Sequence, residues 1–565
     1  MKKLILFWCF LLSVHILYAA IVTKENAERI AVDFFNKNYK NKTRSVLHLE
    51  MVYDGVPPES RLSEVPAFYV FNNNNGKGFV IVAGDDSIDN ILGYSFNNNF
   101  DIAELPENLK HWLSQWQYAV TQIRAKDTKR IVSRSQNLNV GEVVVQLETA
   151  RWDQHYPYND ICPIIDGKKA VTGCVPTAMA IVMRYHKWPH KGNGTLPSYR
   201  RNDLVLEERP LGHVYNWDDM LLEYGNDYTQ KQIDAVATLM FDCGMACQVS
   251  YGARGTGGDT RNVLRALVKY MGYDKSGRFL YRKVVDDEEW YTTIKKELDE
   301  GRPMVYDGDA TNSAHAFVVD GYTTNNYFSV NWGWSGSGNG FYLLSDMMGF
   351  NINQKTIINI KPDEGGIEEL GSIRLVGKGL EYEKMDVLIN QQFNLKVNLI
   401  FLGMQFNGLM SLQLVNKEGI MKEILYETSF SSSLGSTTQL GLNLMIKSKI
   451  DVGDKIRCFY KNVGENEWKR VIGSSNCNNE VFVADEYTIE ESTMIKFNKK
   501  ARILTLQLKD DVEVQFYTAD GRNLSSILQI EDNMVKIETS ELRGKYILKL
   551  VKKQYNELKI LNLSF

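Results

Sequence analysis

Apolar residues recur at helical spacing in the stretch 171–189, VTGCVPTAMAIVMRYHKWP. The spacing predicts a helix with one buried face, formed by Val175, Ala178, Met179, Val182 and Tyr185. Thr172 is suited to cap this helix, and Pro176 suits its first turn. Cys174 then lies where free backbone N–H groups and the helix dipole favour a thiolate. The pattern indicates a reactive cysteine, although most free cysteines are small buried hydrophobic residues.

Two stretches rich in strand-forming residues follow much later, 316–320 and 327–332, joined by a segment of turn residues. We expect them to pair as an antiparallel hairpin with Asp320 facing Tyr327. In that register His315 lies opposite the last residue of the second strand.

That last residue is Trp332, and Asn331 lies beside it, so one end of the hairpin would present an imidazole, an amide and an indole. A cysteine at a helix N-terminus that faces a histidine, with an amide to orient the ring, is the arrangement of cysteine acyl-transfer enzymes. The hypothesis is a Cys174 and His315 pair with Asn331 as its orienting group.

Four separated blocks resemble, in the same order, the streptopain family of papain-like cysteine peptidases. The blocks are TGCVPTAMAIVMRYHKWP, YNWDDML, HAFVVDGY and NWGWSGSGNGFY. The similarity spans residues 140–362. It implies an α+β, papain-like catalytic domain with a helical half and an antiparallel β half. It also implies that the enzyme cleaves proteins without a cofactor. The preferred substrates carry a bulky hydrophobic residue just before the residue at the cut.

The resemblance assigns roles to individual residues. Cys174 in TGC corresponds to the nucleophile, and His315 in HAF corresponds to the general base and acid. Asn331 and Trp332 in NWGW fall where the family has its histidine-orienting and histidine-shielding side chains. The NWGW motif borders the substrate groove in the family, so the resemblance favours Trp334 as a wall of that groove over the alternative that it only packs the core.

The family also has an upstream glutamine, in the pattern Q-G-x-P-Y-N. It corresponds here to Gln154 in DQHYPYN, where His155 stands in place of the glycine. The resemblance implies that the Gln154 side-chain amide and the Cys174 backbone N–H hold the oxyanion.

The N-terminal part divides into two segments. Residues 1–20 carry two lysines, an apolar run and a small-residue pair, which is typical of a secretory signal peptide. Residues 21–135 show two apolar helical faces with strands between them, and resemble the inhibitory pro-segment of streptopain-like peptidases. Its polar, basic end at 124–137 is expected to be the exposed site of maturation. The product is therefore expected to be a zymogen, secreted or held at the cell surface.

The C-terminal part alternates apolar and polar residues at strand spacing, which predicts two all-β, sandwich-like domains at 365–483 and 485–565. The second resembles the C-terminal sorting domains of type IX secretion, which implies the secretion machinery as a partner. Cys458 and Cys477 are the cysteines of the first domain, and an exported protein could join them in a disulfide.

Composition excludes several classes. A net charge of −4 over 565 residues argues neither for a nucleic-acid partner nor for an anionic membrane. His186 and His190 flank a proline without an adjacent glutamate, and Cys243 and Cys247 have no second ligand pair at zinc-finger spacing, so we expect no metal.

Two other classes of function stay open. A surface adhesin or binding protein could retain the peptidase scaffold as a relic and act through its C-terminal β domains. A transglutaminase-like transferase would share the Cys–His chemistry, but such a site expects an aspartate where this chain has Asn331. Labelling of Cys174 by a thiol-trapping epoxide would separate an enzyme from a binding protein.

Overall fold

The structure is a computed structural model. The predicted signal peptide and residues 126–137 of the predicted linker lie outside the residues that it describes. Those described are 21–38, 47–56, 65–74, 77–86, 88–103, 105, 107–125, 138–201, 203–310, 313–344, 354–368, 370–382, 390–403, 405–451, 453–483, 493–498, 503–508, 512–518, 522–531, 534–539, 542, 545–552 and 557–564.

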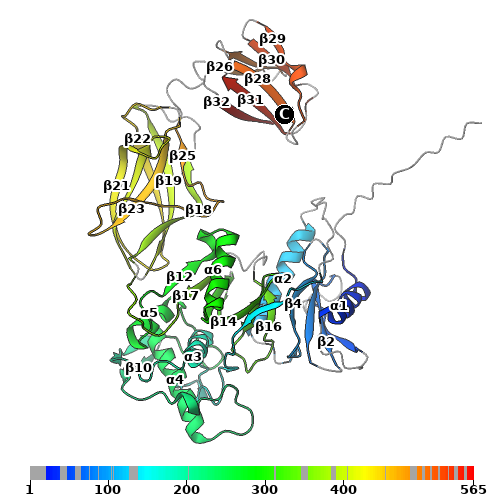
Figure 1. Ribbon diagram of the computed structural model, residues 1–565, viewed down its shortest axis with the longest axis vertical. Helices are drawn as coiled ribbons and strands as arrows, with labels where there is room; N and C mark the ends of the chain where they lie inside the picture. Colours follow the sequence, from blue (N-terminus) through cyan, green and yellow to red (C-terminus); the bar gives the residue numbers. More distant parts are fainter. Residues whose placement is uncertain are drawn as a thin grey trace, which may run out of the picture.

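Residues 21–125 form an α+β unit (Figure 1). Its first helix buries the apolar face that the sequence predicts, including Ala27, Ile30 and Phe34. The elements are α1 (Lys24–Asn38), β1 (Leu49–Tyr53), β2 (Phe68–Asn73), β3 (Phe79–Ala83), β4 (Ile91–Ser95) and α2 (Glu107–Ala125).

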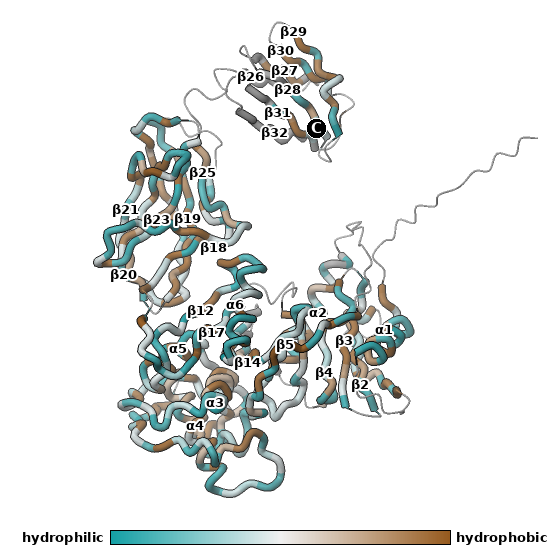
Figure 2. Tube along the Cα trace, viewed as in Figure 1, coloured by the Kyte–Doolittle hydropathy of each residue, from teal (hydrophilic) through white to brown (hydrophobic). Residues whose placement is uncertain are grey.

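Residues 138–362 combine four helices with sheet strands. The helices are α3 (Cys174–His186), α4 (Gln230–Cys247), α5 (Arg261–Tyr270) and α6 (Asp287–Asp299). Helix α3 is almost wholly buried and is among the more hydrophobic helices in Figure 2. It packs against α4 and α5 and against the strands β13 (Met304–Ala310) and β14 (Ser313–Thr323). The predicted helix at 171–189 therefore lies at the junction between helices and sheet.

The other strands of this part are of two kinds, those of the main sheet and shorter ones outside it. The sheet strands are β5 (Val143–Gln146), β12 (Arg278–Tyr281), β15 (Tyr327–Asn331), β16 (Gly340–Leu343) and β17 (Lys355–Ile358). The short elements are β6 (Ile164–Ile165), β7 (Lys168–Lys169), β8 (Thr195–Leu196), β9 (Tyr199–Arg201), β10 (Leu204–Leu206), β11 (Arg209–Pro210), η2 (Trp217–Asp219) and η3 (Arg282–Val284).

One sheet joins the N-terminal unit to the following part, in the order β1-β2-β3-β4-β16-β15-β14-β13-β17-β12. The junction is antiparallel, with Tyr94 of β4 facing Phe341 of β16 and Gly93 facing Tyr342. A Cβ at Gly93 would lie 2.6 Å from the Tyr342 ring, so the close contact needs a glycine there. Backbone hydrogen bonds and side-chain packing thus both attach the predicted pro-segment to the predicted catalytic part.

The β14–β15 hairpin differs from the predicted register. Val318 faces Asn331, two residues further along the second strand than the sequence predicts, and a β-bulge follows at Asp320. His315 consequently lies beyond the end of β15 and faces Gly308 of β13. It does not face the tryptophan at the end of the second strand.

The cause of this difference is Gly321. The sequence predicts that the turn starts at this glycine, but β14 continues through it to Thr323. A Cβ at Gly321 would lie 2.5 Å from the Val145 carbonyl oxygen of β5. The glycine therefore permits close approach of a third strand inside the sheet, and the turn forms later in the chain.

In residues 372–482 the described elements are strands, and most of their buried apolar residues form a core of their own. Cys458 and Cys477 are both buried free thiols, so the disulfide considered above is not formed. Cys477 instead places its sulfur 3.2 Å from the Gly377 carbonyl oxygen. The strands are β18 (Ser372–Tyr382), β19 (Gln392–Leu402), β20 (Gln405–Val415), β21 (Met421–Ser433), β22 (Thr437–Met445), β23 (Lys455–Asn462), β24 (Lys469–Arg470) and β25 (Val481–Phe482).

The last unit is also built from strands, around a small core that includes Leu506, Phe516 and Leu548. No helix in the described part of the chain is long and apolar enough to span a membrane. The elements are β26 (Thr493–Asn498), β27 (Ile503–Leu508), β28 (Val512–Thr518), η5 (Ser525–Ile527), β29 (Gln529–Glu531), β30 (Met534–Glu538), β31 (Lys545–Lys552) and β32 (Glu557–Ser564).

Candidate active site

Helix α3 begins at Cys174 without a side-chain cap. The preceding Gly173 has a φ of 94°, and a Cβ there would lie 2.9 Å from a Thr256 methyl carbon, so glycine is required. Thr172, which the sequence predicts as the cap, instead places its hydroxyl 2.8 Å from the hydroxyl of Thr177. That prediction is wrong because the capping position is occupied by Gly173, with its positive φ, and not by the threonine.

The thiol of Cys174 is partly buried. Burial is the largest influence on its pKa and raises it, and the nearby carboxylate of Asp307 acts in the same direction. The backbone N–H groups of Ala316, Val175 and Cys174 act to lower the pKa. The balance raises the pKa of the Cys174 thiol. In this conformation loss of water outweighs the effect of the helix N-terminus on the thiol pKa, and the thiolate stays a prediction for the matured enzyme.

His315 lies on β14, partly exposed, and directly precedes Ala316. Because the Cys174 thiol approaches the backbone N–H of Ala316, the fold brings the helix start and the histidine-bearing strand into contact. The start of α3 and the strand residue that follows His315 thus lie side by side, although they are far apart in the sequence.

A buried acidic residue beneath this pair was missed in the sequence. Asp307 of β13 faces Ala316 of β14, and its carboxylate lies 2.8 Å from the Lys355 ammonium group. The same carboxylate accepts a hydrogen bond from the Thr260 hydroxyl. The ammonium group offsets a negative charge that would otherwise oppose ionisation of the thiol. The available signal was a lone aspartate inside the apolar strand at 304–307.

Asn331 is buried, and its side-chain amide forms hydrogen bonds with the segment 149–150, which precedes helix α3. Its Nδ2 donates to the Thr149 hydroxyl at 3.0 Å and to the Ala150 carbonyl at 2.9 Å, while its Oδ1 accepts from the Gly333 N–H at 3.2 Å. Both amide hydrogens therefore serve the segment 149–150 in this conformation. The sequence predicts them near the imidazole of His315.

Trp332 is buried in an aromatic cluster. Its ring centroid lies 5.0 Å from that of Phe317 and 5.2 Å from that of Tyr342, and its indole N–H donates to the Gly338 carbonyl at 3.1 Å. Tyr342 also contacts Trp112 of α2, at 5.0 Å between ring centroids. The predicted shielding tryptophan is thus covered, through Tyr342, by the N-terminal unit.

Gln154 and Trp334 lie on two adjoining segments. Gln154 is buried, and its carbonyl accepts from the Thr172 N–H at 3.0 Å, two residues before the nucleophile candidate. Trp334 is partly buried, and its ring centroid lies 5.7 Å from that of His155. The structure therefore places the predicted oxyanion residue beside the start of α3, with Trp334 at its flank. Among the described residues, no three metal-ligating side chains come together.

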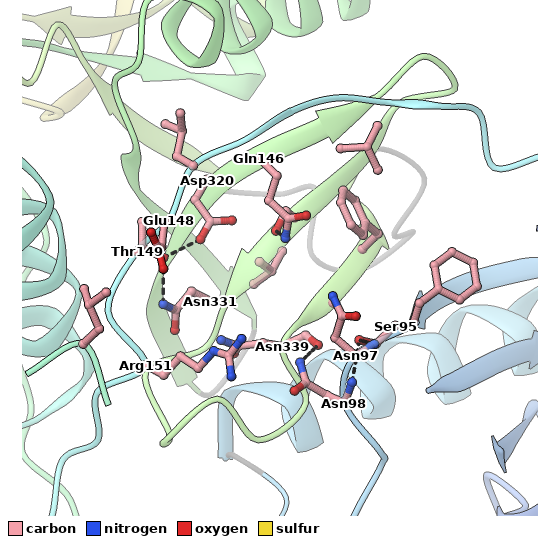
Figure 3. Close-up of a pocket in the computed structure, with 18 of the residues that line it drawn as sticks. Ser95, Asn97, Asn98, Gln146, Glu148, Thr149, Arg151, Asp320, Asn331 and Asn339 are labelled. Carbon is pink, nitrogen blue, oxygen red and sulfur yellow. Dashed lines mark hydrogen bonds between the residues drawn. The ribbon is translucent and has the colours of Figure 1, made fainter. Parts of the chain in front are cut away.

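A cavity of about 600 Å³ lies between the two units, next to Asn331 (Figure 3). Asp320 lies in its wall, and its Oδ2 accepts a hydrogen bond of 2.5 Å from the Thr149 hydroxyl, which in turn binds Asn331. Burial raises the pKa of Asp320 to about 6. The charged residues that share this cavity are Glu148, Arg151 and Glu223.

This raised pKa predicts a pH-dependent stability. Because the folded-state pKa exceeds the unfolded value of about 3.9, folding binds a proton, and stability falls as pH rises from about 4 to 6. The cost above pH 6 is about 3 kcal/mol. Asp320→Asn should remove this dependence and raise the melting temperature by a few degrees at pH 7.5, with little change at pH 4.

The measurement is thermal unfolding between pH 4 and 8, with the exposed Asp203→Asn as a control. An unchanged pH dependence in Asp320→Asn would contradict the assignment.

Comparison with known proteins identifies the family of this chain. Residues 152–342 match the model of the Peptidase C10 family, and residues 19–120 match that of the Spi protease inhibitor. Streptopain from Streptococcus pyogenes is 31% identical over 368 residues, which are 60% of this chain and 92% of streptopain.

The thiol protease/hemagglutinin PrtT from Porphyromonas gingivalis is 31% identical over 420 residues, 68% of this chain. The match spans only 47% of PrtT, about half its length. The solved prointerpain A fragment of Prevotella intermedia is 28% identical, with a TM-score of 0.46, over 56% of this chain and 99% of the fragment.

These matches cover both the segment that carries Cys174 and His315 and the N-terminal unit that is joined to it through the sheet. The chain is a cysteine peptidase with an inhibitor-like pro-segment, and it belongs to the Peptidase C10, or streptopain-like, family.

Proposed function

We propose that this chain is the zymogen of a secreted cysteine endopeptidase whose catalytic dyad is Cys174 and His315. The observation that carries the proposal is the contact of the Cys174 thiol with the backbone N–H of Ala316, the residue after His315. A nucleophile at a helix start and an imidazole on the facing strand are the two groups that acyl transfer through a thiolate requires.

In this mechanism the Cys174 thiolate attacks the carbonyl carbon of a peptide bond. The Cys174 backbone N–H and the Gln154 side-chain amide donate to the oxyanion as its charge develops. His315 protonates the departing amine and then activates water, which releases the acyl group. No cofactor takes part in any of these steps.

Asn331 and Trp332 take their roles once the pro-segment has left. With α2 and β4 in place, the Asn331 amide binds Thr149 and Ala150, and Trp332 is covered. Release of the pro-segment uncovers Tyr342 and the aromatic cluster behind it, and in the matured enzyme Asn331 orients the imidazole. The raised pKa of the Cys174 thiol in the present conformation supports an inhibited resting state.

We assign domains on the same basis. Residues 1–20 are the signal peptide, 21–135 the pro-segment, 136–362 the two-part papain-like catalytic domain, and 365–483 a β-sandwich spacer or binding module. Residues 485–565 act as a sorting domain for export across an outer membrane. The described elements of the last two segments are strands apart from the short helix η5, which supports this division.

The test is incubation of the purified full chain with casein under reducing conditions. We expect stoichiometric labelling of Cys174 by a thiol-trapping epoxide after pro-segment release, and amine-terminated casein fragments. Sequencing the new N-termini of enzyme and fragments reports the maturation site and the cleavage preference. Absence of labelling would support a binding protein, and crosslinked casein a transferase.

A further inference from the structure

The carboxylate of Asp153 makes contacts that the mechanism above does not use. Its Oδ1 accepts from the backbone N–H of Gln154 at 2.5 Å, from the N–H of His155 at 3.0 Å and lies 2.9 Å from His155 Nδ1. Its Oδ2 accepts from the Ser335 hydroxyl at 3.0 Å. One side chain therefore joins the segment that carries the oxyanion residue to the loop that carries Trp334.

The loop that Asp153 holds adopts a conformation that needs such support. Ser335 has a φ of 50°, in the left-handed backbone region that residues other than glycine rarely adopt. Its backbone N–H donates to the Trp152 carbonyl at 3.0 Å. The next residue, Gly336, approaches Arg151 so closely that a Cβ would lie 3.1 Å from its side chain. The loop is thus fixed on the segment 151–155.

Gln154 is held at both of its backbone groups. Its N–H is bound by Asp153, and its carbonyl is bound by the N–H of Thr172, two residues before Cys174. These two bonds fix the Gln154 backbone relative to the nucleophile. Loss of the first bond would leave the amide donor attached at one point only.

We propose that Asp153, braced by the Trp334 loop, is a positioning residue that holds the Gln154 side-chain amide in register with Cys174 for oxyanion binding. The inference rests on the proposed function, because it acts through Gln154 as the oxyanion donor. A displacement of such a donor by about 1 Å weakens its hydrogen bond to the oxyanion. Because that bond forms only in the transition state, the displacement lowers the rate of the chemical step.

His155 strengthens the hold of Asp153 on this segment. Its hydrogen bond to Asp153 raises the pKa of His155, although burial opposes the shift. Burial acts to raise the pKa of Asp153, but hydrogen bonds from the His155 side chain and from the two backbone N–H groups lower it overall. The imidazolium–carboxylate pair therefore holds below the raised His155 pKa and weakens as pH rises through it. The charged neighbours at this flank are Arg151 and Glu223, an ion pair at 3.4 Å.

A double-mutant cycle tests the proposal in matured full-length enzyme with dye-labelled casein. Gln154→Ala should lower kcat by about 10²–10³-fold, and Asp153→Ala by roughly 10- to 100-fold, each with little change in KM. The double variant should be no slower than Gln154→Ala alone, because Asp153 acts through that amide.

Two further variants sharpen the test. Asp153→Asn keeps an acceptor oxygen, so it should recover at least about tenfold in kcat over Asp153→Ala, while the His155-dependent limb of the pH profile moves to lower pH. Asp160→Ala, in the same loop but outside these contacts, serves as a matched control. Epoxide labelling of Cys174 in every variant reports whether the site is still folded.

Each result has a distinct meaning. Additive losses in the double variant, or full activity of Asp153→Ala beside a slow Gln154→Ala, would overturn the positioning role and leave the peptidase assignment intact. A fully active Gln154→Ala would overturn both the oxyanion role of Gln154 and the inference built on it. Activity retained by Cys174→Ala would overturn the proposed dyad itself.

Discussion

Replacement of Cys174 by alanine is expected to lower casein hydrolysis by about four orders of magnitude or more, because removal of the nucleophile abolishes the acyl-enzyme. The change removes one sulfur from a partly exposed position, so the chain should still fold. The purified variant should accumulate with its pro-segment attached, since maturation uses the same nucleophile. The measurements are the rate of fragment release from dye-labelled casein and the mass of the chain after incubation.

The matched control is Cys477→Ala. Cys477 is a buried free thiol in the β-sandwich, at a distance from the helix start, and its replacement should leave casein hydrolysis at the unmodified rate. Hydrolysis that persists in Cys174→Ala and disappears in Cys477→Ala would overturn the assignment of the nucleophile.

Trp112→Ala is expected to release the catalytic part from inhibition. The Trp112 ring is fully buried and lies 5.0 Å from that of Tyr342, and Tyr342 packs on Trp332 of the site. Truncation of a buried tryptophan costs about 3–5 kcal/mol, which corresponds to a loss of roughly 10²-fold or more in docking of the pro-segment. The lag before casein hydrolysis by the purified full chain should therefore shorten at least about tenfold.

Two variants separate docking from folding of the pro-segment. Tyr118→Ala on the same helix changes a side chain that is 56% exposed, and it should leave the lag unchanged. Gly93→Ala adds a Cβ that would meet the Tyr342 ring at 2.6 Å, so it disturbs the β4–β16 junction without opening a cavity. An unchanged lag in both Trp112→Ala and Gly93→Ala would show that this interface does not control activity.

The register of the β14–β15 hairpin shows where sequence patterns reach their limit. Strand-forming residues on either side of a turn-rich segment identified both strands, because such composition is a local property. The turn was placed too early because Gly321 looks like a turn residue, whereas its function is to admit the β5 backbone. A contact with a strand far away in the sequence decided the register, and no local pattern contains that information.

Asn331 illustrates the same limit for the site. The motif placed it near the imidazole, but the structure engages both amide hydrogens with Thr149 and Ala150. The Asp307 and Lys355 pair beneath the thiol was also missed, because its members are buried by strand pairing and not by any shared motif. Each of these contacts joins residues that are widely separated in the chain.

The sequence alone determined the helix that begins at Cys174, the two strands that follow His315 and the apolar faces of the pro-segment helices, because periodicity and short motifs are properties of neighbouring residues. Only the tertiary structure decided that the pro-segment extends the catalytic sheet, that burial raises the pKa of the Cys174 thiol, and that Asp153 links Gln154 to the Trp334 loop. These features depend on burial and on pairing between distant segments, which arise when the chain packs.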